Sequence, residues 1–161
     1  AEFRVGILTI TEKWAHYMPD NSVFGGFVTE DYLQAKYPSD IQNDQFWING
    51  AICPNKELVA DVLALDFNEA LFGDFEESLA CEKSYTDLAF THISNNYDVF
   101  SFNGKELQAD FDLITKGRVS ETANATNTIL GENRLFIEEG ASVSCAIINA
   151  ESGPVYIGKV L

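Results

Sequence analysis

The sequence has few basic residues. Lysine and arginine together number 10, against 25 aspartates and glutamates, so the 161-residue chain carries a formal net charge of −15 at pH 7. A surface of this charge repels nucleic-acid phosphates and anionic lipid headgroups. Sequence-independent binding to nucleic acid or to a membrane is therefore not expected, although a few clustered bases could still hold one small phosphate ligand.

The chain also has few residues that bind transition metals. Its cysteines, Cys53, Cys81 and Cys145, are far apart and form no C-x-x-C pair, and its two histidines belong to no H-E-x-x-H pattern. The cysteines are expected to be reduced and mostly buried thiols of a cytoplasmic protein. A metal site made of cysteine is not expected.

Several familiar signals are missing as well. The sequence has neither a G-x-x-x-x-G-K-[ST] phosphate loop nor a G-x-S-x-G nucleophile motif. No apolar run has the length of a transmembrane helix, and no secretion signal is recognisable. The hydrophobic residues, 46% of the chain, predict a globular fold with a sizeable core.

Four segments have the pattern of helices. The clearest follows Asn55, a good N-cap residue, because its apolar positions form one stripe. The segment 105–116 has apolar residues at helical spacing and ends at Gly117, a common C-terminal cap. Shorter helices are predicted over 30–36 and around 85–93.

Other segments are apolar enough to be strands. The segments 45–48, 68–72 and 97–102 are each predicted to be a strand that ends at a turn. The run 3–10 fits a buried strand and the inner face of a helix equally well. Strands that alternate with helices favour an α/β layer with a mixed or parallel sheet.

The last 25 residues repeat with a period of six. This period is typical of a left-handed parallel β-helix, in which the first residue of each hexad points inward. The tail is therefore predicted to be the first coil of a β-helix, with ordinary strands of chance period as the alternative. The first positions of the hexads are Ile137, Val143, Asn149, Val155 and Leu161.

Two local features could bind a ligand. Asn49-Gly50 follows a predicted strand, and ligands of open α/β sheets bind outside the carboxyl ends of strands. The alternative is a plain turn, because Asn-Gly is common in turns. Four of the ten bases could cluster around a phosphate or could be ordinary solvated charges. They are Arg4, Lys13, Lys116 and Arg118.

Several segments together resemble one family of bacterial proteins. The family is that of the sugar-1-phosphate nucleotidyltransferases similar to the bifunctional N-acetylglucosamine-1-phosphate uridyltransferase and glucosamine-1-phosphate acetyltransferase. Its members are often labelled glucose-1-phosphate thymidylyltransferase. The resemblance runs nearly end to end. Its segments are RVGILTI (4–10), EKW (12–14), ING (48–50), DFDLITKGR (110–118), NT (127–128), FIEEG (136–140) and NAESGPVYIG (149–158).

The resemblance implies a fold in three parts. A nucleotidyltransferase-like, Rossmann-like α/β domain is expected over 1–119, a linker over 120–136, and the first coil of a left-handed β-helix over 137–161. The chain then looks like an internal fragment, preceded by a phosphate-binding loop and followed by further hexads where acetyl-CoA would bind for an acyltransferase reaction. The fragment alone is expected to be inactive and a monomer or dimer, whereas the parent protein is expected to be a homo-oligomer.

The resemblance also implies a reaction. A nucleotidyl group would pass from a nucleoside triphosphate, UTP or dTTP, to a sugar-1-phosphate, with Mg²⁺ as cofactor and pyrophosphate as the second product. Arg4 and Lys13 fall where the family has basic residues and are candidates for contact with a phosphate.

The metal site is the point at which this sequence departs from the family pattern. Asn49 and Gly50 match a strand-end Gly-Asp of better-known nucleotidyltransferases, whose aspartate holds Mg²⁺, but the next residue here is Ala51. Asp110 is then the nearest candidate for a compensating acid. The departure keeps an alternative open, in which the chain is a non-catalytic module of a hexapeptide-repeat acyltransferase that binds a sugar or nucleotide or serves assembly.

Overall fold

The chain is a mixed α/β protein built from short elements. The computed structural model describes residues 2–40, 46–67, 69–72, 82–85, 88–131 and 134–159. Within these ranges the strands pair two by two, so the single layered sheet predicted from the sequence is not formed by the described residues. None of the described helices is long and apolar enough to cross a lipid bilayer.

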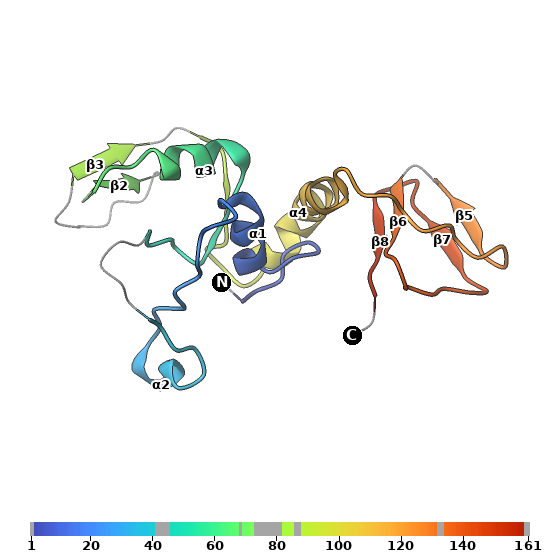
Figure 1. Cartoon of the computed structure of the whole chain (residues 1–161), viewed down its shortest axis with the longest axis horizontal. Helices are drawn as coiled ribbons and strands as arrows, with labels where there is room; N and C mark the ends of the chain where they lie inside the picture. Colours follow the sequence, from blue (N-terminus) through green and yellow to red (C-terminus); the bar gives the residue numbers. More distant parts are fainter. Residues whose placement is uncertain are drawn as a thin grey trace. The chain divides into compact units, whose positions relative to one another are not determined.

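The chain divides into two units, and Figure 1 labels the elements of both. Unit 1 is Ala1–Glu2 with Ile10–Ser94, and unit 2 is Phe3–Thr9 with Asn95–Leu161. In unit 1, β1 pairs with β4 in antiparallel orientation and β2 pairs with β3 in parallel orientation. The elements of unit 1 are α1 (Ile10–Tyr17), α2 (Asp31–Gln34), β1 (Ile52–Cys53), α3 (Lys56–Leu63), β2 (Glu69–Phe72), β3 (Glu82–Tyr85) and β4 (Thr91–His92).

Helix α3 forms as the sequence predicts. The Asn55 side chain accepts a hydrogen bond from the Leu58 amide at 2.8 Å, which satisfies one of the unpaired donors at the helix start. The same side chain donates to the Ala89 carbonyl at 2.9 Å and so ties the cap to the segment before β4. Leu58 and Val59, from the predicted apolar stripe, are buried.

Helix α1 is held on β1 by its tryptophan. The Trp14 indole nitrogen donates to the Ile52 carbonyl at 2.9 Å, and Trp14 is itself buried together with Ile10. An indole N–H needs such a partner when its ring leaves water. The bond fixes the start of β1 next to the helix, directly after the turn at Asn49-Gly50.

Two sequence predictions in unit 1 are wrong. Residues 46–48 are not a strand, and Phe46 and Trp47 are 50% and 63% exposed, while residue 45 lies outside the described residues. The helix predicted around 85–93 is instead the end of β3 and the whole of β4. A short apolar run fits either state, and here pairing with β1 decides for the strand at 91–92.

Unit 2 contains one long helix and two parallel strand pairs. Helix α4 begins at Asp98, although a strand was predicted over 97–102, and it runs through Asn103 and Gly104. Gly117 has a φ of +74° just after the helix, as expected for a C-terminal cap. The elements are α4 (Asp98–Thr115), β5 (Thr128–Leu130), β6 (Leu135–Ile137), β7 (Ile147–Asn149) and β8 (Val155–Ile157).

The strand pairs of unit 2 join segments at nearly constant spacing. In β5 and β7, Thr128 pairs with Ile147, and in β6 and β8, Leu135 pairs with Val155, so partners lie 19 and 20 residues apart. Three strict hexads would bring the chain back after about 18 residues. Strand β5 also lies inside 120–136, where a linker was predicted.

Burial in the tail agrees only in part with the predicted hexad phase. Ile137 is buried as predicted, whereas Asn149 is exposed although the hexads place it inward, and Leu161 lies outside the described residues. Ile148 and Ala150, on either side of Asn149, are buried. Cys145, expected to be buried, is exposed and has a φ of +55°, while Cys53 is buried as predicted. One or two additional residues per return shift which side chains face inward.

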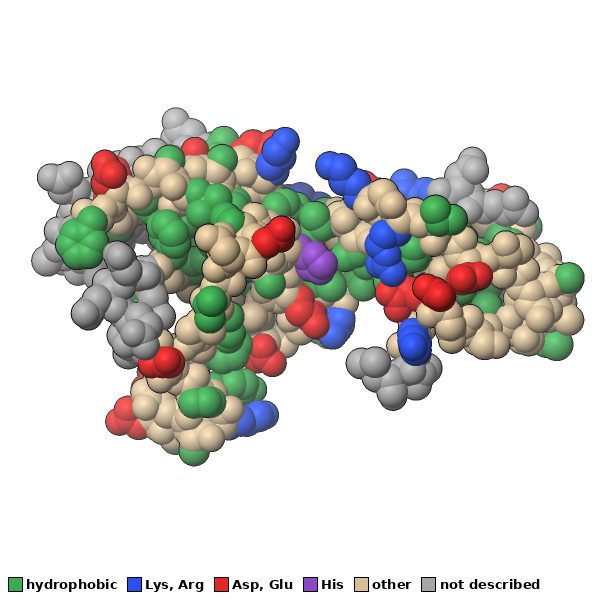
Figure 2. Space-filling view, viewed as in Figure 1, with side chains coloured by type: hydrophobic (Ala, Val, Ile, Leu, Met, Phe, Trp, Pro, Cys, Tyr) green, Lys and Arg blue, Asp and Glu red, His purple; other side chains and the backbone are tan. Residues whose placement is uncertain are grey.

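Glu138 is the hub of a polar cluster in unit 2, although the sequence suggests only an exposed turn. One carboxylate oxygen accepts from the Arg118 guanidinium at 3.0 Å and from the Tyr156 hydroxyl, and the other accepts from the Lys159 amide at 2.9 Å. The Arg118 guanidinium also lies over the Phe136 ring, 5.0 Å from its centroid. Figure 2 shows acidic and basic side chains next to one another on this unit.

These donors change the titration of Glu138. The Tyr156 hydroxyl, followed by the Lys159 amide and the Arg118 guanidinium, lowers the pKa of Glu138 from 4.5 to about 2. Hydrogen bonds to a carboxylate favour its charged form, so folding and ionisation of Glu138 stabilise each other.

Replacing Asn55 tests the cap of α3. We expect Asn55→Ala to lower the free energy of unfolding by about 1 kcal/mol, because the Leu58 amide loses its acceptor. Chemical denaturation followed by circular dichroism measures this value. Asn96→Ala, at an exposed turn before α4, is the matched control and should change it by less than about 0.5 kcal/mol. Equal effects of the two substitutions would contradict the cap.

Replacing Glu138 tests the polar cluster through the pH dependence of stability. Since the folded pKa is depressed, the stabilisation is complete above pH 4.5 and is lost as the pH falls towards 2. Glu138→Gln should therefore lower stability at pH 7 and flatten the decline of stability between these two pH values. Thermal unfolding at several pH values measures both effects. The exposed neighbour provides the control, since Glu139→Gln should leave the wild-type decline in place.

Candidate functional site

Residues 3–9 form a tight loop in unit 2, where the sequence left strand and helix open. Arg4 and Thr9 form an antiparallel bridge, and the Val5 amide donates to the Leu8 carbonyl at 3.3 Å. Val5 is fully buried, which anchors the start of the loop in the core of the unit. The turn at Gly6, Ile7 and Leu8 therefore lies at the tip.

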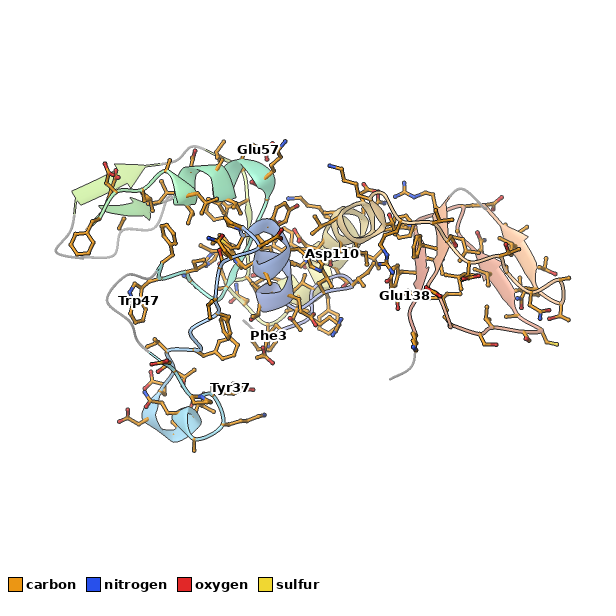
Figure 3. The ribbon with its side chains drawn as sticks, viewed as in Figure 1. Phe3, Tyr37, Trp47, Glu57, Asp110 and Glu138 are labelled. Carbon is orange, nitrogen blue, oxygen red and sulfur yellow. The ribbon has the colours of Figure 1, made fainter. Side chains whose placement is uncertain are left out.

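Three successive backbone amides of this tip donate to side chains of α4. The Gly6 amide donates to Asn103 Oδ1 at 2.9 Å, and the Ile7 and Leu8 amides donate to Asp110 Oδ2 at 2.8 and 3.0 Å. Consecutive N–H groups that point to one place form a concave site for an anion, and here the anion is a carboxylate of the same chain. Figure 3 labels Asp110 on α4.

Helix geometry explains why these two acceptors lie together. Asn103 and Asp110 are seven residues apart on α4, which is two turns, so they lie on the same face. Asp110 is only 2% exposed. A buried carboxylate is tolerated when it accepts hydrogen bonds, and the loop amides supply them.

Gly6 allows the loop to approach the helix this closely. Its φ is +89°, and a Cβ at this position would lie 2.6 Å from Asp110 Oδ2 and 2.8 Å from backbone atoms of Glu106 and Leu107. The positive φ disfavours any residue with a side chain. The backbone of a helix cannot shift cheaply to make room.

The loop brings together two of the predicted site residues, Arg4 and Asp110. Arg4 is exposed, and its Nη1 donates to the Ile7 carbonyl, within the peptide chain that Asp110 holds. A guanidinium at the surface beside a rigid backbone is suited to bind a phosphate. Contact of Arg4 with a phosphate stays a prediction from the sequence.

Lys13, Asn49 and Gly50 lie in unit 1, whereas the candidate bases Lys116 and Arg118 lie in unit 2. Lys13 is on α1 and is 1% exposed, so its ammonium is not at the surface where a phosphate could reach it directly. Asn49 and Gly50 lie in a turn before β1 and do not follow a strand. The Asn49 side chain accepts from the Ala51 amide at 3.0 Å within this turn, and ligand binding by Asn49 and Gly50 stays a prediction.

The described residues do not fit a resident magnesium site. They contain no group of three or more acidic, histidine or cysteine side chains that could hold a metal. The oxygen of Asp110 that faces the loop already accepts two amide hydrogens. Magnesium needs several oxygen ligands in octahedral geometry, so Asp110 is assigned to the loop and not to a metal.

An open pocket of about 420 Å³ lies in unit 1 around the segment 24–40. Rings of Phe24, Phe27 and Tyr37 line it and meet edge to face, with centroids 5.0 and 5.5 Å apart. The ammonium of Lys36 lies 5.1 Å from the Tyr37 ring centroid. Such a surface can stack on a flat base or on a sugar ring.

Sequence reasoning missed Asn103, the second acceptor for the loop. The segment around it was predicted to be a strand that ends at Asn103-Gly104. The signal was nevertheless present, because Asn103 and Asp110 have helical spacing once the helix is extended to Asp98.

Replacing Gly6 tests the close approach of loop and helix. Gly6→Ala should lower the free energy of unfolding by about 2–4 kcal/mol, since it adds a strained φ and a clash with backbone atoms. Chemical denaturation measures the loss. Gly104→Ala is the control with an expected effect of opposite sign. A Cβ at Gly104 meets nothing within 4 Å, and alanine is the better helix former, so this substitution should raise the free energy of unfolding by about 1 kcal/mol. A neutral Gly6→Ala would mean that the loop lies elsewhere in solution.

The part of the chain that contains this site matches a known protein family. A family model described as sugar nucleotidyl transferase matches residues 1–119, which include the loop 3–9, the turn at Asn49 and Asp110. No curated protein and no solved structure matches the chain. Because the matched residues are well over half of the 161, the chain belongs to the sugar nucleotidyl transferase family.

Proposed function

We propose that this protein transfers a nucleotidyl group from UTP or dTTP to a sugar-1-phosphate. The family match supports nucleotidyl transfer to a sugar in general. The observation that carries the finer proposal is the loop 3–9, in which an exposed arginine stands on a backbone fixed by α4. A rigid cation is the feature that phosphoryl chemistry most needs from a protein, since catalysis there is mainly positioning and neutralisation of charge.

The reaction requires little covalent chemistry from the chain. An oxygen of the sugar-1-phosphate attacks the α-phosphorus of the triphosphate and forms a new P–O bond. The bond from the α-phosphorus to the bridging oxygen of the β-phosphate breaks, and pyrophosphate leaves with both electrons of that bond. The guanidinium of Arg4 would stabilise the negative charge on the phosphate oxygens. Magnesium would enter as part of the triphosphate substrate.

A second function is favoured by the aromatic pocket in unit 1. Rings of Phe24, Phe27 and Tyr37 around an open cavity could hold a sugar or base without any catalytic group beside them. With Ala51 at the position of the usual metal-binding acid, a non-catalytic binding or assembly module is the alternative. Acyl transfer with acetyl-CoA, which the resemblance implies, stays a prediction from the sequence.

An activity assay with arginine variants tests the proposed reaction. The protein, in the full extent of its reading frame, is incubated with UTP or dTTP and a panel of sugar-1-phosphates, and pyrophosphate release is measured. Arg4→Ala should lower kcat/KM by about 10- to 100-fold, as expected for the loss of a charge-assisted contact. Lys56→Ala, at an exposed base of α3 that is no candidate for phosphate contact, should leave kcat/KM nearly unchanged.

The same assay separates the two functions. Release of no pyrophosphate with any pair of substrates, together with saturable binding of a sugar phosphate or nucleotide in calorimetry, would favour the binding module. Full activity of the Arg4→Ala variant would remove the arginine from the proposed site.

A further inference from the structure

The anchor of the loop 3–9 has no part in the reaction as proposed. Asp110 is buried on α4, and it neither touches the surface nor joins a metal cluster in the described part of the chain. Its neighbour Asp112, on the same helix, is exposed. A carboxylate buried at this cost requires partners, and two of them are the Ile7 and Leu8 amides.

The peptide groups of Ile7 connect Asp110 to Arg4. The Ile7 amide donates to Asp110 Oδ2 at 2.8 Å, while the Ile7 carbonyl accepts from Arg4 Nη1. The position of the guanidinium therefore depends on the orientation of Ile7, and that orientation depends on the aspartate. Asn103 supports the same arrangement from the Gly6 side at 2.9 Å.

We infer that Asp110 is a positioning residue for phosphate binding. It fixes the backbone of Ile7 and Leu8, and through the Ile7 carbonyl it orients the exposed guanidinium of Arg4 toward a phosphate. The ligand class, an inorganic or nucleotide pyrophosphate group, rests on the proposed function. The anchoring of the loop does not, because it follows from hydrogen bonds within unit 2.

The negative charge of Asp110 makes it possible to distinguish a positioning role from a purely electrostatic one. Asp110 is negative, so removing it should raise the affinity for pyrophosphate if its field were all that mattered. A positioning role predicts the opposite sign, because a mobile arginine must be ordered again each time a ligand binds. The sign of the change in affinity therefore separates the two explanations.

The experiment uses the full chain and needs no turnover. Cleavage by trypsin after Arg4, followed by mass spectrometry as release of the segment that ends at Arg4, reports how often the loop opens, and calorimetry with pyrophosphate reports binding. Asp110→Ala should speed release and weaken pyrophosphate binding, each by about tenfold or more. Asp110→Asn keeps a side-chain oxygen as acceptor and should restore most of both. Asp112→Ala, the matched control on α4, should change neither.

Two further variants, Asn103→Ala and Arg4→Ala, keep the inference testable even if Asp110→Ala does not fold. Asn103→Ala removes only the Gly6 anchor at an exposed position, so it should fold even if Asp110→Ala does not, and it should shift both readouts in the same direction by a smaller factor. Arg4→Ala should weaken pyrophosphate binding by itself. Adding Asp110→Ala to it should weaken binding no further, because the aspartate acts through the arginine.

The outcomes distinguish this inference from the proposed function. Unchanged or tighter pyrophosphate binding by both Asp110→Ala and Asn103→Ala, with weaker binding by Arg4→Ala, would overturn the positioning role and leave the proposed function standing. Unchanged trypsin release in both anchor variants would overturn the anchoring itself. No loss of pyrophosphate binding in Arg4→Ala would overturn the positioning role and the phosphate contact together.

Discussion

Two hydrogen bonds to one carboxylate oxygen hold the loop 3–9 against α4 in unit 2. Asp110 Oδ2 accepts from the amides of Ile7 and Leu8, 103 and 102 residues away along the chain. A charged acceptor makes these bonds stronger than bonds to a neutral group. Because these bonds hold the loop on α4, they also fix the positions of Gly6 at the tip, of the buried Val5 and of the exposed Arg4.

Glu138 is a second carboxylate of unit 2 that is held by several hydrogen-bond donors, but these donors are of another kind. Its donors are mainly side chains, the Tyr156 hydroxyl and the Arg118 guanidinium, whereas Asp110 accepts from the backbone amides of Ile7 and Leu8. In a chain with a net charge of −15, an acid that is paired with a base, as Glu138 is with Arg118, adds less to the general repulsion than an acid without such a base. A phosphate ligand approaching such a chain depends on a local arrangement of donors, and a fixed arginine is of more use to it than several mobile ones.

An element of this fold can be predicted from the sequence when the contacts that determine its conformation are local. The cap and stripe of α3 and the glycine after α4 are local signals, and the structure has both. The first half of α4 was mistaken for a strand because its apolar residues carry no clear period. The loop 3–9 could not be predicted, since its shape is set by acceptors about a hundred residues later.

The candidate site shows the same division. Arg4 and Asp110 were both selected from the sequence, Asp110 as a candidate metal ligand, and its part as an acceptor for loop amides was not foreseen, because residue type alone does not tell one role from the other. The tail was recognised as periodic, and Ile137 is buried as its predicted phase requires, but Asn149 is exposed where the chain returns after 19 and 20 residues instead of 18.

The distance along the chain between the loop and its anchor also matters during synthesis. The loop leaves the ribosome first, and its partner Asp110 follows 103 residues after Ile7. At about 5–20 residues per second, the wait is roughly 5–20 seconds, to which the length of the exit tunnel adds more. For that time Val5 and its apolar neighbours have no helix to pack on. This apolar segment of the nascent chain therefore stays without its packing partner while the next hundred residues are made.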